Sequence, residues 1–133
     1  MKKYLLLLMA LLMVSCLDFL SNSPDDEKEE VILNQTTYEL RVGETIKTQN
    51  LGEVNLVDVL EDSRCPIDVE CVWEGNLKIS LEIDEVKYEL NTALEPKEKE
   101  VKGKKVSIYQ VTPDAISTKE IKKDEYIITI MVN

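Results

Sequence analysis

Apolar and polar side chains alternate along much of the chain after residue 31. Every second residue is apolar over residues 77–83 and again over residues 86–90. A period of two predicts strands with one buried face. Only Asp84 and Glu85 separate the two runs, so we expect a β-hairpin with a tight turn at these two residues.

The last segment, residues 126–132, is apolar on both faces, which predicts a central strand covered on both sides. Shorter strands are expected at residues 38–42, 45–48, 54–60 and 106–111, with a further one at residues 31–33. Such a series of short strands separated by turn residues is typical of an antiparallel β-sandwich, Ig-like or related. We therefore predict one all-β domain over residues 31–133, with a helix within residues 112–123 as an open alternative.

The N-terminus has the pattern of a secretory signal. Two lysines precede an apolar run of 11 residues, from Tyr4 to Val14, and Ser15 and Cys16 follow it. An 11-residue helix reaches about 16 Å, roughly half of a ~30 Å hydrocarbon core, so a membrane-spanning helix fits less well. We expect residues 1–15 to be a signal peptide.

The sequence Met-Val-Ser-Cys at residues 13–16 resembles the lipobox of bacterial lipoproteins. The resemblance implies that Cys16 is acylated, palmitate being one expected acyl chain, and becomes the first residue of the mature protein. Methionine stands where leucine is commoner in that family. A plain secretory signal with an incidental cysteine is the alternative.

The segment after Cys16 is acidic, with six acids and one lysine among residues 17–30, and we expect it to be a disordered tether. Removal of residues 1–15 takes away two lysines and no acid, so the mature chain carries 14 basic and 26 acidic side chains, a net charge of −12. This charge repels nucleic acid. It also repels anionic lipids, so acyl chains must provide attachment to the outer membrane. The acidic run resembles signals that export some lipoproteins to the cell surface, and the periplasmic and surface faces both stay open.

Two cysteines remain, Cys65 and Cys71, in the stretch EDSRCPIDVECVWEGN. In an exported protein such a pair is expected to form a disulfide. A redox pair fits less well, because the spacing is Cys-x5-Cys and nearby acids disfavour a thiolate. A zinc site fits least, because two cysteines in a chain without histidine cannot supply four ligands.

The same stretch carries the candidate binding residues. Trp73 is expected to pack near the disulfide and cap one end of the core, and its alternative role is an exposed binding anchor. Arg64 is expected to form a salt bridge with Asp62 or Glu70, and its alternative role is to grip a partner's carboxylate. Asp62 and Glu74 complete the candidate set.

The motif DSRCP-x4-CVW-x-G resembles a family of small bacterial secreted proteins and lipoproteins. Similar members carry runs like VSIYQVTPDAIS and EYIITIMV, so the likeness covers most of residues 38–132. The family has no established activity. The resemblance implies a compact β domain and supplies no catalytic residue.

An enzyme is not expected, because the chain has no histidine to activate a nucleophile and no glycine-rich phosphate loop. No cofactor is expected either. The preferred hypothesis is a non-catalytic binding or structural module that contacts an envelope protein, a glycan or a secreted factor. The runner-up is an inhibitor of a secreted peptidase that uses the disulfide-closed loop. A third class is a calcium-dependent binder using Asp58, Glu61, Asp62 and Asp84.

Overall fold

The computed structural model describes residues 35–133, which form eight β-strands. Their bounds are β1 (Thr36–Arg41), β2 (Thr45–Thr48), β3 (Gly52–Asp62), β4 (Leu77–Ile83), β5 (Val86–Asn91), β6 (Glu98–Val101), β7 (Lys104–Thr112) and β8 (Ile127–Val132), with a 3-10 helix, η1 (Lys123–Glu125), before β8. The predicted all-β, sandwich-like fold class is confirmed. The predicted signal peptide, the acylated Cys16, the tether and the strand at residues 31–33 lie outside the described residues.

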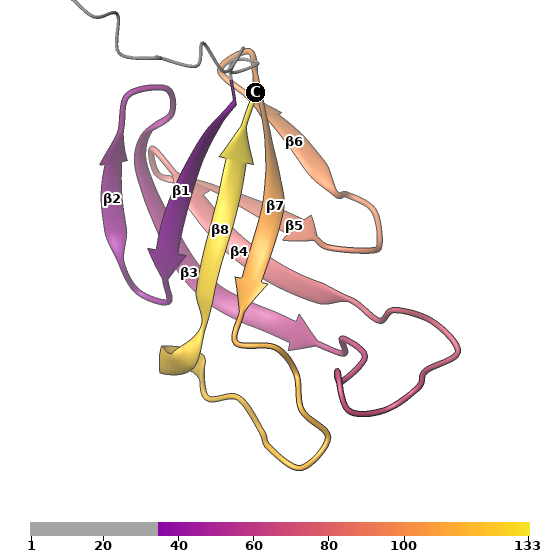
Figure 1. Ribbon diagram of the computed structural model, residues 1–133. Coiled ribbons are helices and arrows are strands. Elements are labelled where there is room, and N and C mark those ends of the chain that lie inside the picture. The colour runs from indigo at the N-terminus through magenta and orange to yellow at the C-terminus, as the bar shows by residue number, and fades with distance from the viewer. Residues whose placement is uncertain (1–34) are drawn as a thin grey trace, which may run out of the picture. The chain divides into compact units, whose positions relative to one another are not determined.

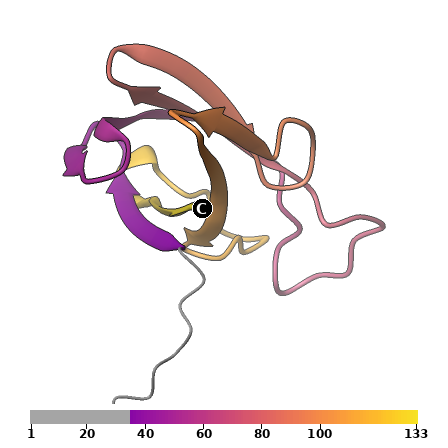
Figure 2. The same cartoon turned by 90° about the horizontal axis from the view of Figure 1, so that it is seen from above.

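The strands form two four-stranded antiparallel sheets, ordered β1-β8-β7-β6 and β2-β3-β4-β5 (Figure 1). Seen from above, the two sheets curve around a common interior (Figure 2). An isolated parallel bridge between Val42 and Leu56 joins the end of β1 to β3. Among residues 35–133, no helix is long and apolar enough to cross a bilayer.

The core is built from the apolar face of each sheet. Leu56, Ile79 and Leu81 from one sheet and Ile128 and Ile130 from the other are fully buried. Burial of each such side chain stabilises the fold by about 1.5–3 kcal/mol. The alternation of apolar and polar residues therefore sets which face of each strand points inward.

The predicted hairpin is confirmed, with β4 and β5 joined at Asp84 and Glu85, both at positive φ. β8 is central in its sheet, as predicted, and lies between β1 and β7. Its second face is only partly covered, because its residues alternate between buried and intermediate exposure. The alternative of a helix within residues 112–123 is wrong, since this segment holds the end of β7 and a long loop, and the short 3-10 helix η1 starts only at its last residue, Lys123.

β6 was not predicted, because residues 95–105 have the composition of a solvated loop. Three of its four residues are charged and exposed, and Val101 alone is buried. A charged edge strand has no apolar alternation to reveal it. Lys102 and Gly103, both at positive φ, form the turn that returns the chain to β7.

Candidate functional site

The segment between β3 and β4, residues 63–76, is closed by a disulfide between Cys65 and Cys71, which confirms the predicted pairing. We call it the stapled loop. Both views show it extending away from the two sheets (Figures 1 and 2). Hydrogen bonds hold the base of the loop in place, whereas the tip exposes its side chains to solvent.

At the base, the two arms of the loop pair with each other. The amide of Ser63 donates to the carbonyl of Asn76 at 2.7 Å, and the amide of Cys65 donates to the carbonyl of Glu74 at 2.8 Å. Gly75 permits this close approach, because it has a φ of +76° and a Cβ there would lie 1.9 Å from the carbonyl oxygen of Ser63. A glycine is therefore required where the arms meet.

The buried side chain of Asn76 fixes the base against the end of β5 and the segment that follows it. Its Nδ2 donates to Oδ1 of Asn91 at 2.9 Å. Its Oδ1 accepts from the amides of Ala93 and Leu94 at 3.1 and 3.3 Å. A buried amide with these partners avoids the cost of unpaired polar groups and holds the two segments in one geometry.

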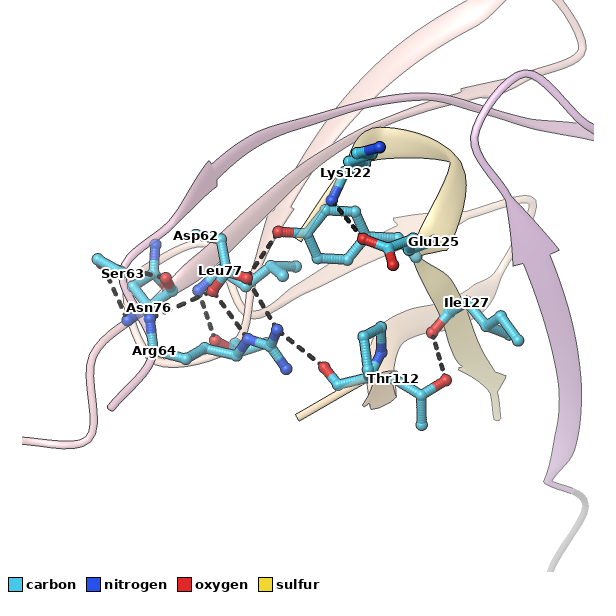
Figure 3. A network of polar contacts seen from close by, with 12 residues as sticks. Asp62, Ser63, Arg64, Asn76, Leu77, Thr112, Lys122, Glu125 and Ile127 are labelled. Atoms are coloured by element: carbon cyan, nitrogen blue, oxygen red, sulfur yellow. Dashed lines mark hydrogen bonds and ion pairs between the residues drawn. The ribbon is translucent and has the colours of Figure 1, made fainter. Parts of the chain in front are cut away.

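A second group of contacts ties the base to the segment before β8. The Nε and Nη2 atoms of Arg64 donate to the two oxygens of Asp62, each at 2.8 Å, and Nη2 also donates to the carbonyl of Pro113 at 3.1 Å (Figure 3). The hydroxyl of Tyr126 donates to Asp62 at 2.7 Å. Of the two roles considered for Arg64, the salt bridge to Asp62 is therefore the one present, and a bidentate pair of this kind is strong and directional.

These contacts set the pKa values of the group. Burial by itself would raise the pKa of Asp62, but the hydrogen bonds from Arg64 and Tyr126 and the charge of Arg64 outweigh it and hold the pKa below its ordinary value. Burial and the neighbouring Asp62 raise the pKa of Tyr126 to about 12. Asp62 is thus a charged structural anchor at neutral pH.

A third contact holds the middle of the loop against residues 113–121. Both oxygens of Asp68 accept from Ser117, at 2.8 Å from its amide and 2.6 Å from its hydroxyl. The amide of Ile67 donates to the carbonyl of Ala115 at 2.9 Å. Three segments distant in the sequence are therefore tied into one cluster of loops.

The tip of the loop exposes apolar side chains. Val72 is fully exposed, Ile67 is largely exposed, and Val69 and Trp73 are 44% and 50% exposed. The expectation that Trp73 caps the core is wrong, because Trp73 is neither buried nor packed against the buried cluster. The next strand, β4, starts only at Leu77, as expected.

A cavity of about 280 Å³ lies at the base of the loop, and Ile67 is the exposed apolar residue of the loop that also lines it. The stapled loop contributes Arg64, Ile67 and Glu74 to its lining, the segment after β5 contributes Ala93, and the segment after β7 contributes Asp114. Of the candidate binding residues, Arg64 and Glu74 are therefore brought together at one cavity. Asp62 lies behind Arg64 as its anchor, and Trp73 follows the exposed Val72 on the tip.

The acids considered for calcium do not form a site. Asp58 pairs with Lys123, Asp62 with Arg64 and Asp84 with Lys102. Within residues 35–133, no group of three or more His, Cys, Asp or Glu side chains is placed to hold a metal ion.

The residues that organise the site include several that the sequence did not single out as functional, namely Asn76, Tyr126, Asp68 and Ser117. Asn76 stands in a turn-like sequence and Tyr126 begins an apolar strand, so nothing local marks their hydrogen bonds. Comparison with known proteins adds no further assignment, because no family model, curated protein or solved structure matches this chain.

Proposed function

We propose that this protein is a lipid-anchored lipoprotein of the bacterial cell envelope and acts as a non-catalytic binding module. The stapled loop is its contact surface. One observation carries the proposal: a disulfide-closed loop projects from the sheets and exposes Ile67, Val69, Val72 and Trp73. Exposed apolar side chains gathered in one place mark interaction sites, and tryptophan is enriched among binding anchors.

The ties at the base support a binding role over a purely structural one. A loop that served only the fold would turn its apolar side chains inward, whereas this loop presents them to solvent. The disulfide, Asn76 and the Asp62–Arg64 pair hold its shape before any partner arrives. Less conformational entropy is then lost on binding, which raises affinity.

The partner we propose is another component of the envelope, a protein or a glycan. The test is a quantitative pull-down from native envelope after crosslinking, with the wild type and two variants. Val72→Ser removes an exposed valine from the tip of the loop. The control, Val86→Ser, removes an exposed valine at the start of β5, next to the hairpin turn and at the end of β4 that does not join the loop. Recovery of the partner should fall with Val72→Ser and stay unchanged with Val86→Ser. Equal recovery from both variants contradicts the proposal.

The second candidate function is inhibition of a secreted peptidase, and the projection of the loop favours it (Figure 2). A rigid convex loop can enter an active-site cleft with little loss of conformational entropy. The protein is tested against a panel of secreted peptidases from its own environment. Slowing of one enzyme by the wild type and by Val86→Ser, but not by Val72→Ser, supports inhibition. A panel in which no enzyme is slowed removes this candidate.

The membrane attachment rests on the lipobox-like sequence ending at Cys16. Several acyl chains hold a protein on a bilayer much better than one, at about 0.8 kcal/mol per buried CH2 group. Radiolabelled palmitate should label the wild type and not Cys16→Ala. Label that persists in Cys16→Ala, or that is absent from the wild type, contradicts the lipid anchor.

A further inference from the structure

The chemistry of the surface around the stapled loop indicates what kind of partner fits it. Two features there share Ile67. One is the apolar patch formed by Ile67, Val69, Val72 and Trp73. The other is the cavity of about 280 Å³ that Ile67 also lines. Because Ile67 belongs to both, a partner that covers the patch at Ile67 also reaches the cavity.

The lining of the cavity is partly apolar and has a net negative charge. Ile67, Ala93 and Ala115 supply apolar surface, and Glu74 and Asp114 supply two carboxylates. Its one cation, Arg64, is paired with Asp62 and also interacts with the charge of Asp114, so a single cation faces three carboxylates. Neither Glu74 nor Asp114 takes part in an ion pair among residues 35–133. An anion is therefore disfavoured in this cavity, and a cation is favoured.

The rest of the loop is also negatively charged. Residues 65–76 include Asp68, Glu70 and Glu74 and no lysine or arginine, and the full chain has a net charge of −10. The potential around the loop thus attracts basic partners and steers their approach. It also repels the anionic headgroups of a membrane surface.

We propose that the stapled loop binds a protein segment in which a lysine or arginine is flanked by apolar side chains. The cationic end enters the cavity between Glu74 and Asp114, while its aliphatic stem lies along Ile67 and Ala93. The flanking apolar side chains of the partner cover Val72 and Trp73. This inference rests on the proposed binding role of the loop and adds the chemistry of the partner.

The test is selection from a displayed library of short random-sequence peptides on the intact immobilised protein. Enriched peptides should share a lysine or arginine next to aliphatic or aromatic residues. Trp73 is the chain's only tryptophan, so binding of each synthetic peptide is followed directly by its fluorescence.

Two double variants separate the local effect of the carboxylates at the cavity from the effect of the protein's overall negative charge. The double variant Glu74→Gln, Asp114→Asn should weaken binding of the enriched peptides by about tenfold. Each exposed charge pair with the peptide contributes about threefold to the affinity, and the double variant removes two such pairs. Glu39→Gln with Glu100→Gln removes the same charge from other exposed positions and should leave binding unchanged. Replacing the basic residue of the peptide by glutamine should weaken binding to the wild type by a similar factor and have little effect on the Glu74→Gln, Asp114→Asn variant.

The outcomes distinguish this inference from the proposed function. Enriched peptides that lack basic residues but lose binding in Val72→Ser overturn the partner chemistry and leave the binding loop standing. Enriched peptides that bind Val72→Ser and wild type equally overturn both, as does a selection that enriches no sequence. A blue shift of Trp73 fluorescence on phosphatidylcholine vesicles, with no response to basic peptides, assigns the patch to a lipid surface and also overturns the inference.

Discussion

The hydroxyl of Tyr126 donates a 2.7 Å hydrogen bond to the carboxylate of Asp62, although 64 positions separate the two residues. Asp62 ends β3 and Tyr126 directly precedes β8, so this bond joins the two sheets at the base of the stapled loop. The same carboxylate holds Arg64, the second residue of the loop. The position of the loop therefore depends on a contact between opposite sheets.

Tyr126→Phe should lower the free energy of unfolding by about 1–2 kcal/mol at neutral pH, because it removes a hydrogen bond to a charged group while Arg64 still pairs with Asp62. Urea denaturation measures this. Tyr109→Phe is the matched control, since Tyr109 is largely exposed and its hydroxyl has no hydrogen bond within residues 35–133. A loss equal to that of Tyr109→Phe would show that the Tyr126 hydroxyl does not hold the loop.

The stability of the protein should also decline in acid through Asp62. The pKa of Asp62 is depressed in the folded protein, because its hydrogen bonds to Arg64 and Tyr126 outweigh burial. Its contribution is therefore fully present above the unfolded pKa of about 4 and is lost as pH falls through the lower folded value. Asp62→Asn should flatten this part of the profile of unfolding free energy against pH. A profile with the same slope in the variant rules out Asp62 as a source of the acid sensitivity.

Asn76→Ala should cost at least about 2 kcal/mol of unfolding free energy, because it leaves Asn91 and the amides of Ala93 and Leu94 without their partner. Gln49→Ala is the control, because it also removes an amide side chain. Gln49 lies exposed in the turn between β2 and β3, so its loss should change stability by no more than about 0.5 kcal/mol. Chemical denaturation compares the two. Similar small losses in both variants would mean that Asn76 does not anchor the loop.

Gly75→Ala and Gly43→Ala separate backbone strain from crowding. Both glycines have positive φ, but a Cβ at Gly43 meets nothing within 4 Å, whereas one at Gly75 meets the backbone of Ser63. Gly43→Ala should cost about 1–2 kcal/mol from strain alone. Gly75→Ala should cost clearly more and raise the alkylation of Cys65 and Cys71 under mild reduction. Equal losses of unfolding free energy in the two variants would contradict the close approach of the two arms at Gly75.

The sequence alone predicted two kinds of feature. These are the elements that follow from the local alternation of apolar and polar residues, and the disulfide that follows from the oxidising compartment of an exported protein. The alternation over residues 77–90 identified β4, β5 and their turn, and the export signal led to the Cys65–Cys71 pair. Each of these depends on neighbours in the chain or on the redox environment. The fold class and the stapled loop could therefore be predicted without coordinates.

The features that were missed depend on long-range contacts or on exposure. β6 is charged, so its pairing with β7 leaves no apolar signal. Trp73 resembles a core residue by type, and only the path of the loop shows that it faces solvent. The Asp68–Ser117 contact joins residues 49 positions apart. Hydrogen bonds between distant polar side chains have no period or spacing by which a sequence could reveal them.

The most direct test of the binding loop is site-specific photocrosslinking in the native envelope. A benzophenone amino acid is placed at position 72, on the exposed tip, or at position 86, at the exposed start of β5. Position 72 should give one discrete adduct that disappears when excess unlabelled protein competes, and position 86 should give none. Identical adducts from both positions, or an adduct at 86 alone, would contradict the account.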